Sequence, residues 1–239
     1  MSNTSVLISA VPLEAQIRAL FPSGTAIAVT DPRLTYAQPF PSESSAVSRA
    51  NDRRRREFNA GRAAVRDAMQ QFALSPKAVP NGPDRAPIWP DGLVGSISHS
   101  GAVCVAAVAR SKDARSVGID VEEDTALDPE LVSSVCTLVE RAWLSAQPKA
   151  QRGLLAKLIF SAKECAYKCQ YPISRTVFDF DTLEITPDLD TGQFEATFTK
   201  DVACFAQGSC FHGRFIIESG VIVTTTVLTQ RPRWSLDRP

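Results

Sequence analysis

The chain has 239 residues, of which 44% are hydrophobic and 22% charged, which is enough apolar material for one sizeable or two small globular cores. Lysine and arginine together number 26, as do aspartate and glutamate, so the net charge is zero and no general attraction to nucleic acid or anionic lipid is indicated. No run approaches the roughly 18 to 20 apolar residues that span a bilayer, and the first residues, MSNTSVLISAVPLEAQ, lack the basic start and apolar length of a signal peptide. We therefore expect a cytoplasmic globular protein without a membrane segment.

The first half of the chain alternates between strand and helix patterns. Residue spacing predicts a short strand and a helix within 5–20, a strand at 25–30 and, after the Pro-rich connector PRLTYAQPFP, a helix from about Ser45 to Phe72. The turn-rich stretch NGPDRAPIWPDG follows, and two strands separated by glycine are predicted in VGSISHSGAVCVAAVAR.

The second half opens with an acidic strand, SVGIDVEED at 116–124, and continues with two helices. The first helix carries ELVSSVCTLVERAW, and the second runs from about Gln151 to Gln170. Beyond Pro172, alternating apolar residues predict short strands in DTLEITP, QFEATF, CFHGRFIIESG and VIVTTTVL. Strands and helices mixed without a regular strand-helix-strand repeat predict an α+β fold.

The six cysteines are scattered through apolar stretches without a CxxC pair, which favours buried free thiols over a disulfide framework or a zinc site. They are Cys104, Cys136, Cys165, Cys169, Cys204 and Cys210. Cys165 and Cys169 lie one helical turn apart and could share a metal ion, but no histidine is near them in sequence. Structural thiols are therefore the favoured interpretation.

Two acids of the acidic strand are predicted to share a face. Side chains alternate along a strand, so Asp120 and Glu122 point to one side while Ile119 and Val121 point into a core. Two neighbouring carboxylates could hold a cation. For the motif alone, however, the favoured interpretation is a strand that ends in a solvated acidic turn at 123–124.

The helix at 151–170 carries a third acid on a polar face. Its apolar stripe consists of Leu155, Leu158, Ile159, Ala162 and Ala166. Glu164 and Lys168 share a different face, one helical turn apart. Taken alone, this pair is typical of a helix surface, where it would contribute only about 0.2 to 0.5 kcal/mol.

The histidines and the arginine run have ordinary alternatives. His99 follows a predicted strand in SISHS and is either a packed side chain or a ligand contact, whereas His212 has no motif around it and is expected to be structural or solvated. The arginines at 53–56 suggest a nucleic-acid patch, but consecutive side chains on a helix point all round its axis and cannot form one binding face. We therefore expect no nucleic-acid partner.

Several motifs, taken together and in order, resemble those of 4'-phosphopantetheinyl transferases. They are EFxxGRxxxR (57–66), RAPIWPDGLVGSISHS (85–100), GIDVE (118–122), FSAKECAYK (160–168) and the ending GRFIIESGVIVTTTVL. The resemblance covers roughly 45–228 and is greatest to the monomeric type that activates surfactin and enterobactin synthetases, especially the enterobactin synthetase component D subgroup. Phe160 stands where many members carry tryptophan.

The resemblance implies a reaction and a metal site. A serine hydroxyl of an apo-carrier protein attacks the β-phosphorus of coenzyme A, which transfers 4'-phosphopantetheine and releases adenosine 3',5'-bisphosphate. Asp120, Glu122 and Glu164 are expected to hold Mg²⁺. Glu164 is either a metal ligand only or also the base that takes the serine proton, directly or through a water, two roles that the sequence does not separate. Lys168 resembles the family lysine that contacts the pyrophosphate, and Lys163 is the second candidate for such a contact.

The resemblance also assigns residues to coenzyme A. Ser98 and His99 match the family pair at the ribose 3'-phosphate, a dianion that favours the forked donors of arginine and a nearby histidine. Arg54 and Arg62 are carried over to the same phosphate. Arg85 is carried over last, because the family often places its basic residue closer to the proline of this motif.

The implied fold is an α+β pseudo-dimer of two similar halves, each a long helix packed on a small antiparallel sheet, with the active site in the cleft between them. We expect residues 1–117 to form the nucleotide side and residues 118–239 the metal and catalytic side. The expected state is a monomer, and the expected partners are coenzyme A and apo-carrier proteins, that is, acyl or peptidyl carrier domains. Carrier docking is expected near the segment 127–144.

Two other functions fit the same residues. A Mg²⁺-dependent phosphohydrolase would use the three acids to cleave a pyrophosphate without a carrier protein. A non-catalytic protein would only bind carrier proteins or nucleotides, and this is disfavoured because the acids and Lys168 are in register.

Overall fold

The computed structural model describes residues 12–230. The N-terminal half contains an antiparallel sheet in the order β1-β3-β2, formed by β1 (Thr25–Thr30), β2 (Leu93–Ser100) and β3 (Val103–Arg110). Its helices are α1 (Leu13–Ala19), the short α2 (Pro41–Ser44) and the long α3 (Asp52–Gln71). The predicted first strand falls largely on residues outside the described range. None of the helices within 12–230 is both long and apolar enough to cross a membrane.

Helix α3 begins later than the predicted start near Ser45. Residues Ser45–Val47 form a single 3₁₀ turn, and Asn51 caps α3 by accepting a hydrogen bond from the backbone N–H of Arg54 at 2.8 Å. Small side chains along one face, among them Ala60, Ala64 and Ala68, are fully buried. Small residues let the helix approach the sheet closely, so the arginines of its first turns are brought near β2.

The C-terminal half contains a larger antiparallel sheet in the order β4-β8-β7-β6-β5. Its strands are β4 (Ala114–Glu123), β5 (Leu183–Asp188), β6 (Gln193–Phe198), β7 (Cys210–Glu218) and β8 (Val221–Thr229). The strands predicted in this half are confirmed. Its helices are α4 (Pro129–Val135), α5 (Leu138–Ala146) and the long α6 (Arg152–Ser174).

One predicted helix is in fact two. The segment ELVSSVCTLVERAW was expected to be continuous, but Cys136 is extended, with φ −96° and ψ 131°, and ends α4. Thr137 then caps α5 reciprocally with Glu140, because each side chain bonds the backbone N–H of the other residue. The hydroxyl-x-x-Glu pattern at 137–140 signals this second helix start.

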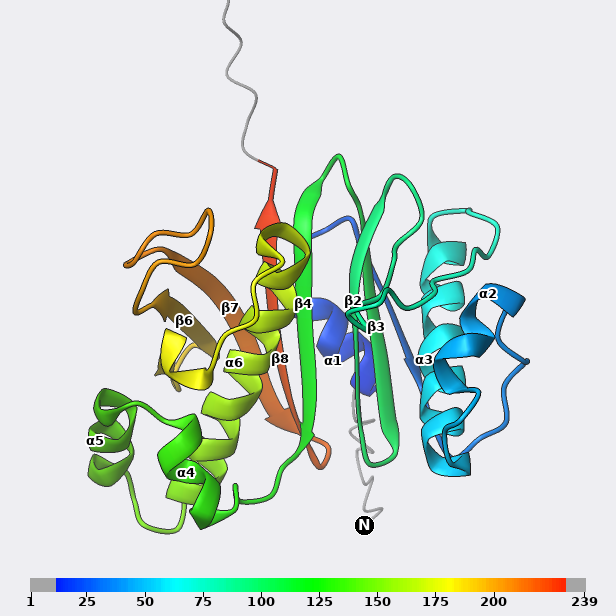
Figure 1. Cartoon of the computed structure of the whole chain (residues 1–239). Coiled ribbons are helices and arrows are strands. Elements are labelled where there is room, and N and C mark those ends of the chain that lie inside the picture. Colours follow the sequence, from blue (N-terminus) through cyan, green and yellow to red (C-terminus); the bar gives the residue numbers. More distant parts are fainter. Residues whose placement is uncertain (1–11, 231–239) are drawn as a thin grey trace, which may run out of the picture.

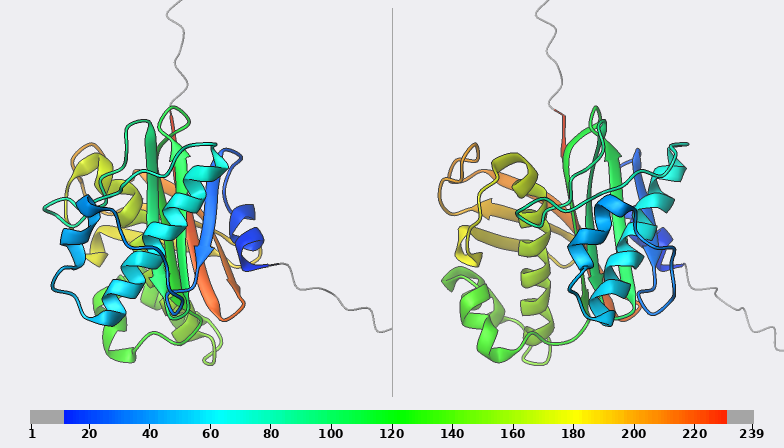
Figure 2. Two further views of the ribbon diagram at one scale, coloured as in Figure 1. Left: turned by 90° about the vertical axis from the view of Figure 1, so that its right-hand side faces the viewer. Right: turned by 45° about the vertical axis from the view of Figure 1, so that its right-hand side comes forward.

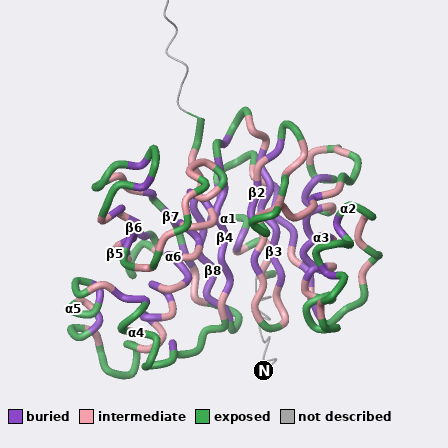
Figure 3. Tube along the Cα trace, viewed as in Figure 1, coloured by how far each residue is buried: buried purple, intermediate pink, exposed green. Residues whose placement is uncertain are grey.

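Helix α3 packs against the first sheet and α6 against the second, and a further cluster of buried side chains joins both sheets to α1 (Figures 1 and 2). This shared cluster includes Val105 and Ala107 of β3 and Ile119 and Val121 of β4. Figure 3 shows the buried trace concentrated along the central strands. The predicted α+β architecture of two halves, each with a long helix on an antiparallel sheet, is confirmed.

The edges of the two sheets meet along β2 and β4. Ser96 Oγ accepts a hydrogen bond from the Ile119 N–H, and Ser98 Oγ accepts one from the Val121 N–H, each at 3.2 Å. Serine hydroxyls thus satisfy the outward N–H groups of an edge strand that has no backbone partner on this side. This seam brings the end of β2 beside Asp120.

Candidate active site

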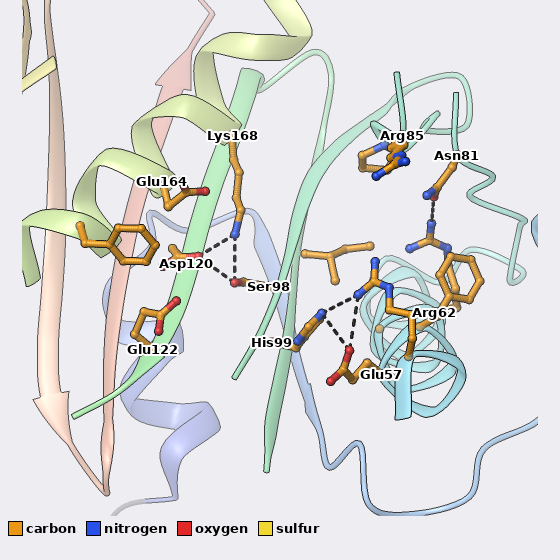
Figure 4. Close-up of a pocket in the computed structure, with 16 residues that line it drawn as sticks. Glu57, Arg62, Asn81, Arg85, Ser98, His99, Asp120, Glu122, Glu164 and Lys168 are labelled. Carbon is orange, nitrogen blue, oxygen red and sulfur yellow. Dashed lines mark hydrogen bonds and ion pairs between the residues drawn. The ribbon is translucent and has the colours of Figure 1, made fainter. Parts of the chain in front are cut away.

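A cavity of about 360 Å³ lies between the two halves and collects nearly all of the predicted site residues (Figure 4). Nine of the ten line it. They are Arg54, Arg62, Arg85, Ser98, His99, Asp120, Glu122, Glu164 and Lys168. The tenth, Lys163, does not line this cavity. The acids gather on the side of β4 and α6, and most of the basic groups on the side of α3 and β2 (Figure 4).

Asp120 lies at the centre of the acid end and is only 3% exposed. One oxygen, Oδ1, accepts from Lys168 Nζ at 2.6 Å and from Ser98 Oγ at 2.9 Å, and Oδ2 accepts from Ser161 Oγ at 2.8 Å. The strand carrying it packs closely on α6 because Gly118 has no side chain: a Cβ there would overlap the carbonyl oxygen of Cys165. The glycine of GIDVE therefore sets the approach of the acidic strand to α6.

The negative charges of Glu122 and Glu164 are less well compensated by nearby cations than the charge of Asp120. Burial raises the pKa of both carboxyls, and the negative charge of Asp120 adds to that rise. The nearest cation to Glu122 is Lys157, whose Nζ lies 3.6 Å from Oε2. A second cation would relieve this crowding of buried negative charge.

The donor set fits a divalent, oxygen-preferring metal ion. Asp120, Glu122 and Glu164 supply only carboxylate oxygens, the ligands that Mg²⁺ favours. Within residues 12–230, the carboxylate oxygens of these three acids do not all lie within 4.8 Å of one another. The ligand atoms of Glu195, Cys210 and His212, on the outer face of the second sheet, do lie that close together. The ammonium of Lys168 already neutralises one of these acids, Asp120, at 2.6 Å.

Lys168 joins the helix to the acidic strand. Besides Asp120, its Nζ contacts Ser98 Oγ at 3.0 Å. Burial lowers the pKa of this ammonium, but the charge of Asp120 and the hydrogen bond to it outweigh burial, so the pKa is raised overall. Lys168 is therefore a cation at the place where a negatively charged substrate would meet the acids.

The opposite end of the cavity is basic. Arg54 Nη1 lies 2.9 Å from His99 Nε2, and because an arginine can only donate, this ring nitrogen is the acceptor. Burial lowers the pKa of His99 below its ordinary value, despite the opposing charge of Glu57, so the ring is neutral near pH 7. Glu57 Oε2 lies 3.6 Å from Arg54 Nη1 and 3.7 Å from His99 Nε2.

Arg62 is almost fully buried and held from three sides. Its Nη2 donates to Asn81 Oδ1 at 2.6 Å, its Nε lies 3.8 Å from Glu43 Oε1, and its guanidinium lies 4.3 Å from the centre of the Phe58 ring. Burial lowers the pKa of Arg62 to about 10, which still leaves it charged at neutral pH. Its Nε is buried on the side of Glu43 and has no hydrogen-bond partner within the described chain, and the charged Arg62 side chain lines the cavity.

Two predicted residues differ from expectation. Ser98 was expected beside His99 at the 3'-phosphate, but its hydroxyl donates to Asp120 and accepts from Lys168 and the Val121 N–H, so it belongs to the acid end. Lys163 was expected to contact coenzyme A, but its buried ammonium bonds the carbonyls of Val135 and Phe180.

Lys163 also forms a buried ion pair with Glu140 at 2.7 Å, and Glu140 in turn accepts from the Ile185 N–H at 2.6 Å. Each residue of an amphipathic helix lies on one of its faces, and Lys163 lies on the face of α6 that packs into the core, not on the face that lines the cavity. All its donors are used there, so it serves to fasten α5 and β5 to α6.

Other residues of the site were not predicted. Glu57 and Asn81 position the basic groups from the cavity wall, and Glu43 supports Arg62 from beneath. Glu57 lies in the motif EFxxGRxxxR, which offered a signal. Glu43 lies in α2, just after the Pro-rich connector, where no sequence pattern distinguishes it, yet it is 1% exposed and pairs with Arg66 at 2.7 Å.

Comparison with known protein families gives a consistent identification. A family model described as the 4'-phosphopantetheinyl transferase N-terminal domain matches residues 42–109. A second, the 4'-phosphopantetheinyl transferase superfamily, matches residues 116–225. The two matches cover the two halves that contribute to the cavity.

Characterised relatives are similar over most of the chain. The 4'-phosphopantetheinyl transferase Svp of Streptomyces mobaraensis is 36% identical over 217 residues, which cover 87% of this chain and 87% of Svp. PptT of Mycobacterium tuberculosis is 31% identical and covers 80% of this chain and 86% of its own. Enterobactin synthase component D of Salmonella typhi is 37% identical over 57% of this chain and 56% of its own. The chain therefore belongs to the 4'-phosphopantetheinyl transferases, enzymes that transfer phosphopantetheine from coenzyme A to carrier proteins and generally depend on a divalent metal.

Proposed function

We propose that the cavity between the halves binds coenzyme A along its length, with the nucleotide at the basic end and the pyrophosphate at the acid end. The observation that supports this most strongly is that one cavity contains both a cluster of arginine and histidine and a cluster of three carboxylates with a lysine. A coenzyme A molecule carries a 3'-phosphate and a pyrophosphate that need these two environments at once.

Mg²⁺ would be held by Asp120, Glu122 and Glu164 and, when bound, neutralises and orients the pyrophosphate. Ser161 and Ser98 fix the carboxylate of Asp120 in position through their hydroxyls. Lys168, a permanent cation at this end, binds the pyrophosphate as well.

Glu164 accepts the proton of the carrier serine, directly or through a water. It lines the cavity one helical turn before Lys168, so the base and the phosphate-binding cation come from one rigid helix. The serine oxygen forms a bond to the β-phosphorus as the bond from that phosphorus to the bridging oxygen breaks. The electron pair leaves with adenosine 3',5'-bisphosphate, and the serine proton remains on the enzyme or the surrounding water.

The 3'-phosphate is bound by His99, Arg54, Arg62 and Arg85, with His99 donating through the ring nitrogen that does not face Arg54. Ser98 acts at the acid end of the cavity, where its hydroxyl holds the carboxylate of Asp120.

We also propose that the halves divide between β3 and β4, close to the boundary expected after residue 117. A single chain provides both ends of the cavity, which supports action as a monomer.

The experiment that tests this function is direct. The protein is incubated with coenzyme A, Mg²⁺ and an apo-carrier protein, and the carrier is weighed by mass spectrometry. We expect the carrier to gain one phosphopantetheine group and adenosine 3',5'-bisphosphate to appear in equal amount. Cleavage of coenzyme A without any gain on several different carriers would indicate a phosphohydrolase instead.

A further inference from the structure

A loop between α3 and β2 crosses from the N-terminal half toward the C-terminal half. In residues 80–90, Asn81 pairs with Pro87, the Gly82 N–H bonds the Ala86 carbonyl at 2.8 Å, and the Ile88 N–H bonds the Pro80 carbonyl at 2.8 Å. The right-hand view of Figure 2 shows this loop reaching toward the C-terminal part of α6. It is a small structured unit, so its tip and its base move together.

The tip of this loop is fastened to α6 through Asp84. Its Oδ2 accepts from the Tyr171 hydroxyl at 2.9 Å and lies 3.3 Å from Arg175 Nη1, while Oδ1 accepts from the Ala86 N–H at 3.1 Å. The Arg175 side chain is 64% exposed, and exposed ion pairs contribute little. The Tyr171 ring stacks on Tyr167 with centroids 5.7 Å apart, which fixes where its hydroxyl points. Tyr171 is therefore the main anchor.

The same loop carries groups that face the nucleotide end. Arg85 has φ +66°, a left-handed conformation that residues with side chains rarely adopt and that persists where neighbouring contacts impose it. The neighbouring Asp84 makes those contacts. Near the base of the loop, Asn81 accepts from Arg62 at 2.6 Å. Displacing the tip would therefore move Arg85 and withdraw support from Arg62.

The anchor also relates the two ends of the cavity to each other. Tyr171 lies about one turn beyond Lys168 on α6, the helix that carries the acid end. Arg85, Pro87, Ile97 and Lys168 line both the active-site cavity and a second cavity of about 660 Å³. The loop thus separates two spaces that would merge if its tip were released.

We propose that the hydrogen bond between Asp84 and Tyr171 is a strap that closes the cleft over coenzyme A and sets the affinity for its nucleotide. The proposal rests on the proposed function of the cavity. Asp84 and Tyr171 are positioning residues, since they act through Arg85 and Arg62 and not on the reacting phosphorus. The Asp84 side chain is 34% exposed, so water competes for the contact and the strap opens to admit coenzyme A and release the nucleotide product.

The test uses Tyr171→Phe, which removes the hydroxyl and keeps the ring that stacks on Tyr167. We expect the KM for coenzyme A, and the Kd for adenosine 3',5'-bisphosphate measured by calorimetry, to rise together by about 3- to 10-fold, with kcat unchanged. Tyr36→Phe is the matched control, because the Tyr36 hydroxyl accepts from the Asp31 N–H at 2.9 Å away from the cavity. It should leave both constants at the wild-type values.

Asp84 supplies the second arm. Asp84→Ala should weaken nucleotide binding at least as much as Tyr171→Phe, whereas Asp84→Asn, which keeps an acceptor oxygen, should restore most of the affinity. The double variant Asp84→Ala/Tyr171→Phe should bind no more weakly than Asp84→Ala alone, as expected for groups that act through one contact. Equal thermal unfolding of the variants separates positioning from a loss of folding.

The outcomes distinguish the strap from the function. Normal carrier modification together with wild-type nucleotide affinity in Tyr171→Phe would overturn the strap alone, and so would additive losses in the double variant. Weakened nucleotide binding in a protein that modifies no carrier would support the strap and refute the transferase assignment.

Discussion

The two ends of the cavity balance their charges in different ways. At the basic end, the cationic groups have partners inside the protein: Arg54 is bonded to His99, Arg62 is bonded to Asn81, and Glu57 lies close to the first pair. This end keeps its arrangement without a ligand. It is therefore suited to binding, where the same contacts serve before and during the reaction.

At the acid end the balance is incomplete. Lys168 neutralises Asp120, but burial and that neighbouring charge leave Glu122 and Glu164 with raised pKa values. This end requires a cation to become stable in its charged form. The basic end, whose charges are matched within the protein, is therefore suited to binding, and the acid end, whose negative charge is unmatched, is suited to the metal-dependent chemistry.

The largest effect should come from the acid end. Glu164→Gln removes the proton acceptor and one metal ligand at nearly constant shape, so kcat should fall by about 10²- to 10⁴-fold. Holo-carrier formation measured by chromatography gives the rate. The matched control is Glu195→Gln, an acid-to-amide change on an exposed strand residue, and it should retain full activity. Wild-type turnover in Glu164→Gln would remove this residue from the chemistry.

The next effect concerns the basic end. His99→Ala should raise the KM for coenzyme A by about 10- to 100-fold and leave kcat nearly unchanged, because the contact is made equally in the ground and transition states. Dephospho-coenzyme A lacks the 3'-phosphate, so the KM values of the variant for coenzyme A and for dephospho-coenzyme A should differ little. If His99→Ala weakened both by the same factor, His99 would be a packing residue.

Substitutions in a third region, the surface of α4 and α5, should change neither coenzyme A binding at the basic end nor the chemistry at the acid end. Helices α4 and α5 expose Leu131, Leu138 and Val139 to 49%, 76% and 61%, and we propose this surface as the carrier docking site. The double variant Leu138→Ser/Val139→Ser should raise the KM for carrier by about 3- to 10-fold while the KM for coenzyme A stays the same. An equal change in both constants would place the docking surface elsewhere.

The smallest effect is one of stability. The pKa of Glu122 is raised by burial and by Asp120, so its ionised form destabilises the metal-free fold as pH rises above the range of an ordinary glutamate, about 4.3. Glu122→Gln cannot ionise. Without metal at pH 8 it should raise the Tm by about 2–4 °C, the change that about 1 kcal/mol produces in a chain of this size.

Two conditions should abolish that gain. Below pH 4 the wild-type carboxyl is protonated, so the Tm values should converge. Mg²⁺ should stabilise the wild type more than the variant at pH 8. A variant that melts below the wild type without metal at pH 8 would show that Glu122 is well compensated and would contradict the proposed imbalance.

Much of the fold could be predicted because alternation and helical spacing are local properties. The strand faces of Asp120 and Ile119 follow from alternation, and both were assigned correctly. The break between α4 and α5 is signalled by the capping pattern at Thr137, although the apolar pattern continues across it. These are questions about neighbouring residues, which a sequence can answer.

The remainder depends on contacts between distant segments. Ser98 and His99 are adjacent in sequence, but alternation sends Ser98 to the seam with β4 and His99 to α3, so they serve opposite ends of the cavity. Lys163 and Glu140 meet only because α5 folds back on α6. The strap residues Asp84 and Tyr171 are 87 positions apart, and no sequence pattern links them.

The central claim is that the basic end binds and the acid end reacts. It is tested most directly by measuring, for His99→Ala and Glu164→Gln, the Kd for coenzyme A and the single-turnover rate at saturating coenzyme A and carrier. We expect His99→Ala to weaken the binding of coenzyme A and keep the single-turnover rate, whereas Glu164→Gln should keep the binding and lose the rate. A slow saturated turnover in His99→Ala, or a loss of affinity in Glu164→Gln as large as that in His99→Ala, would contradict it.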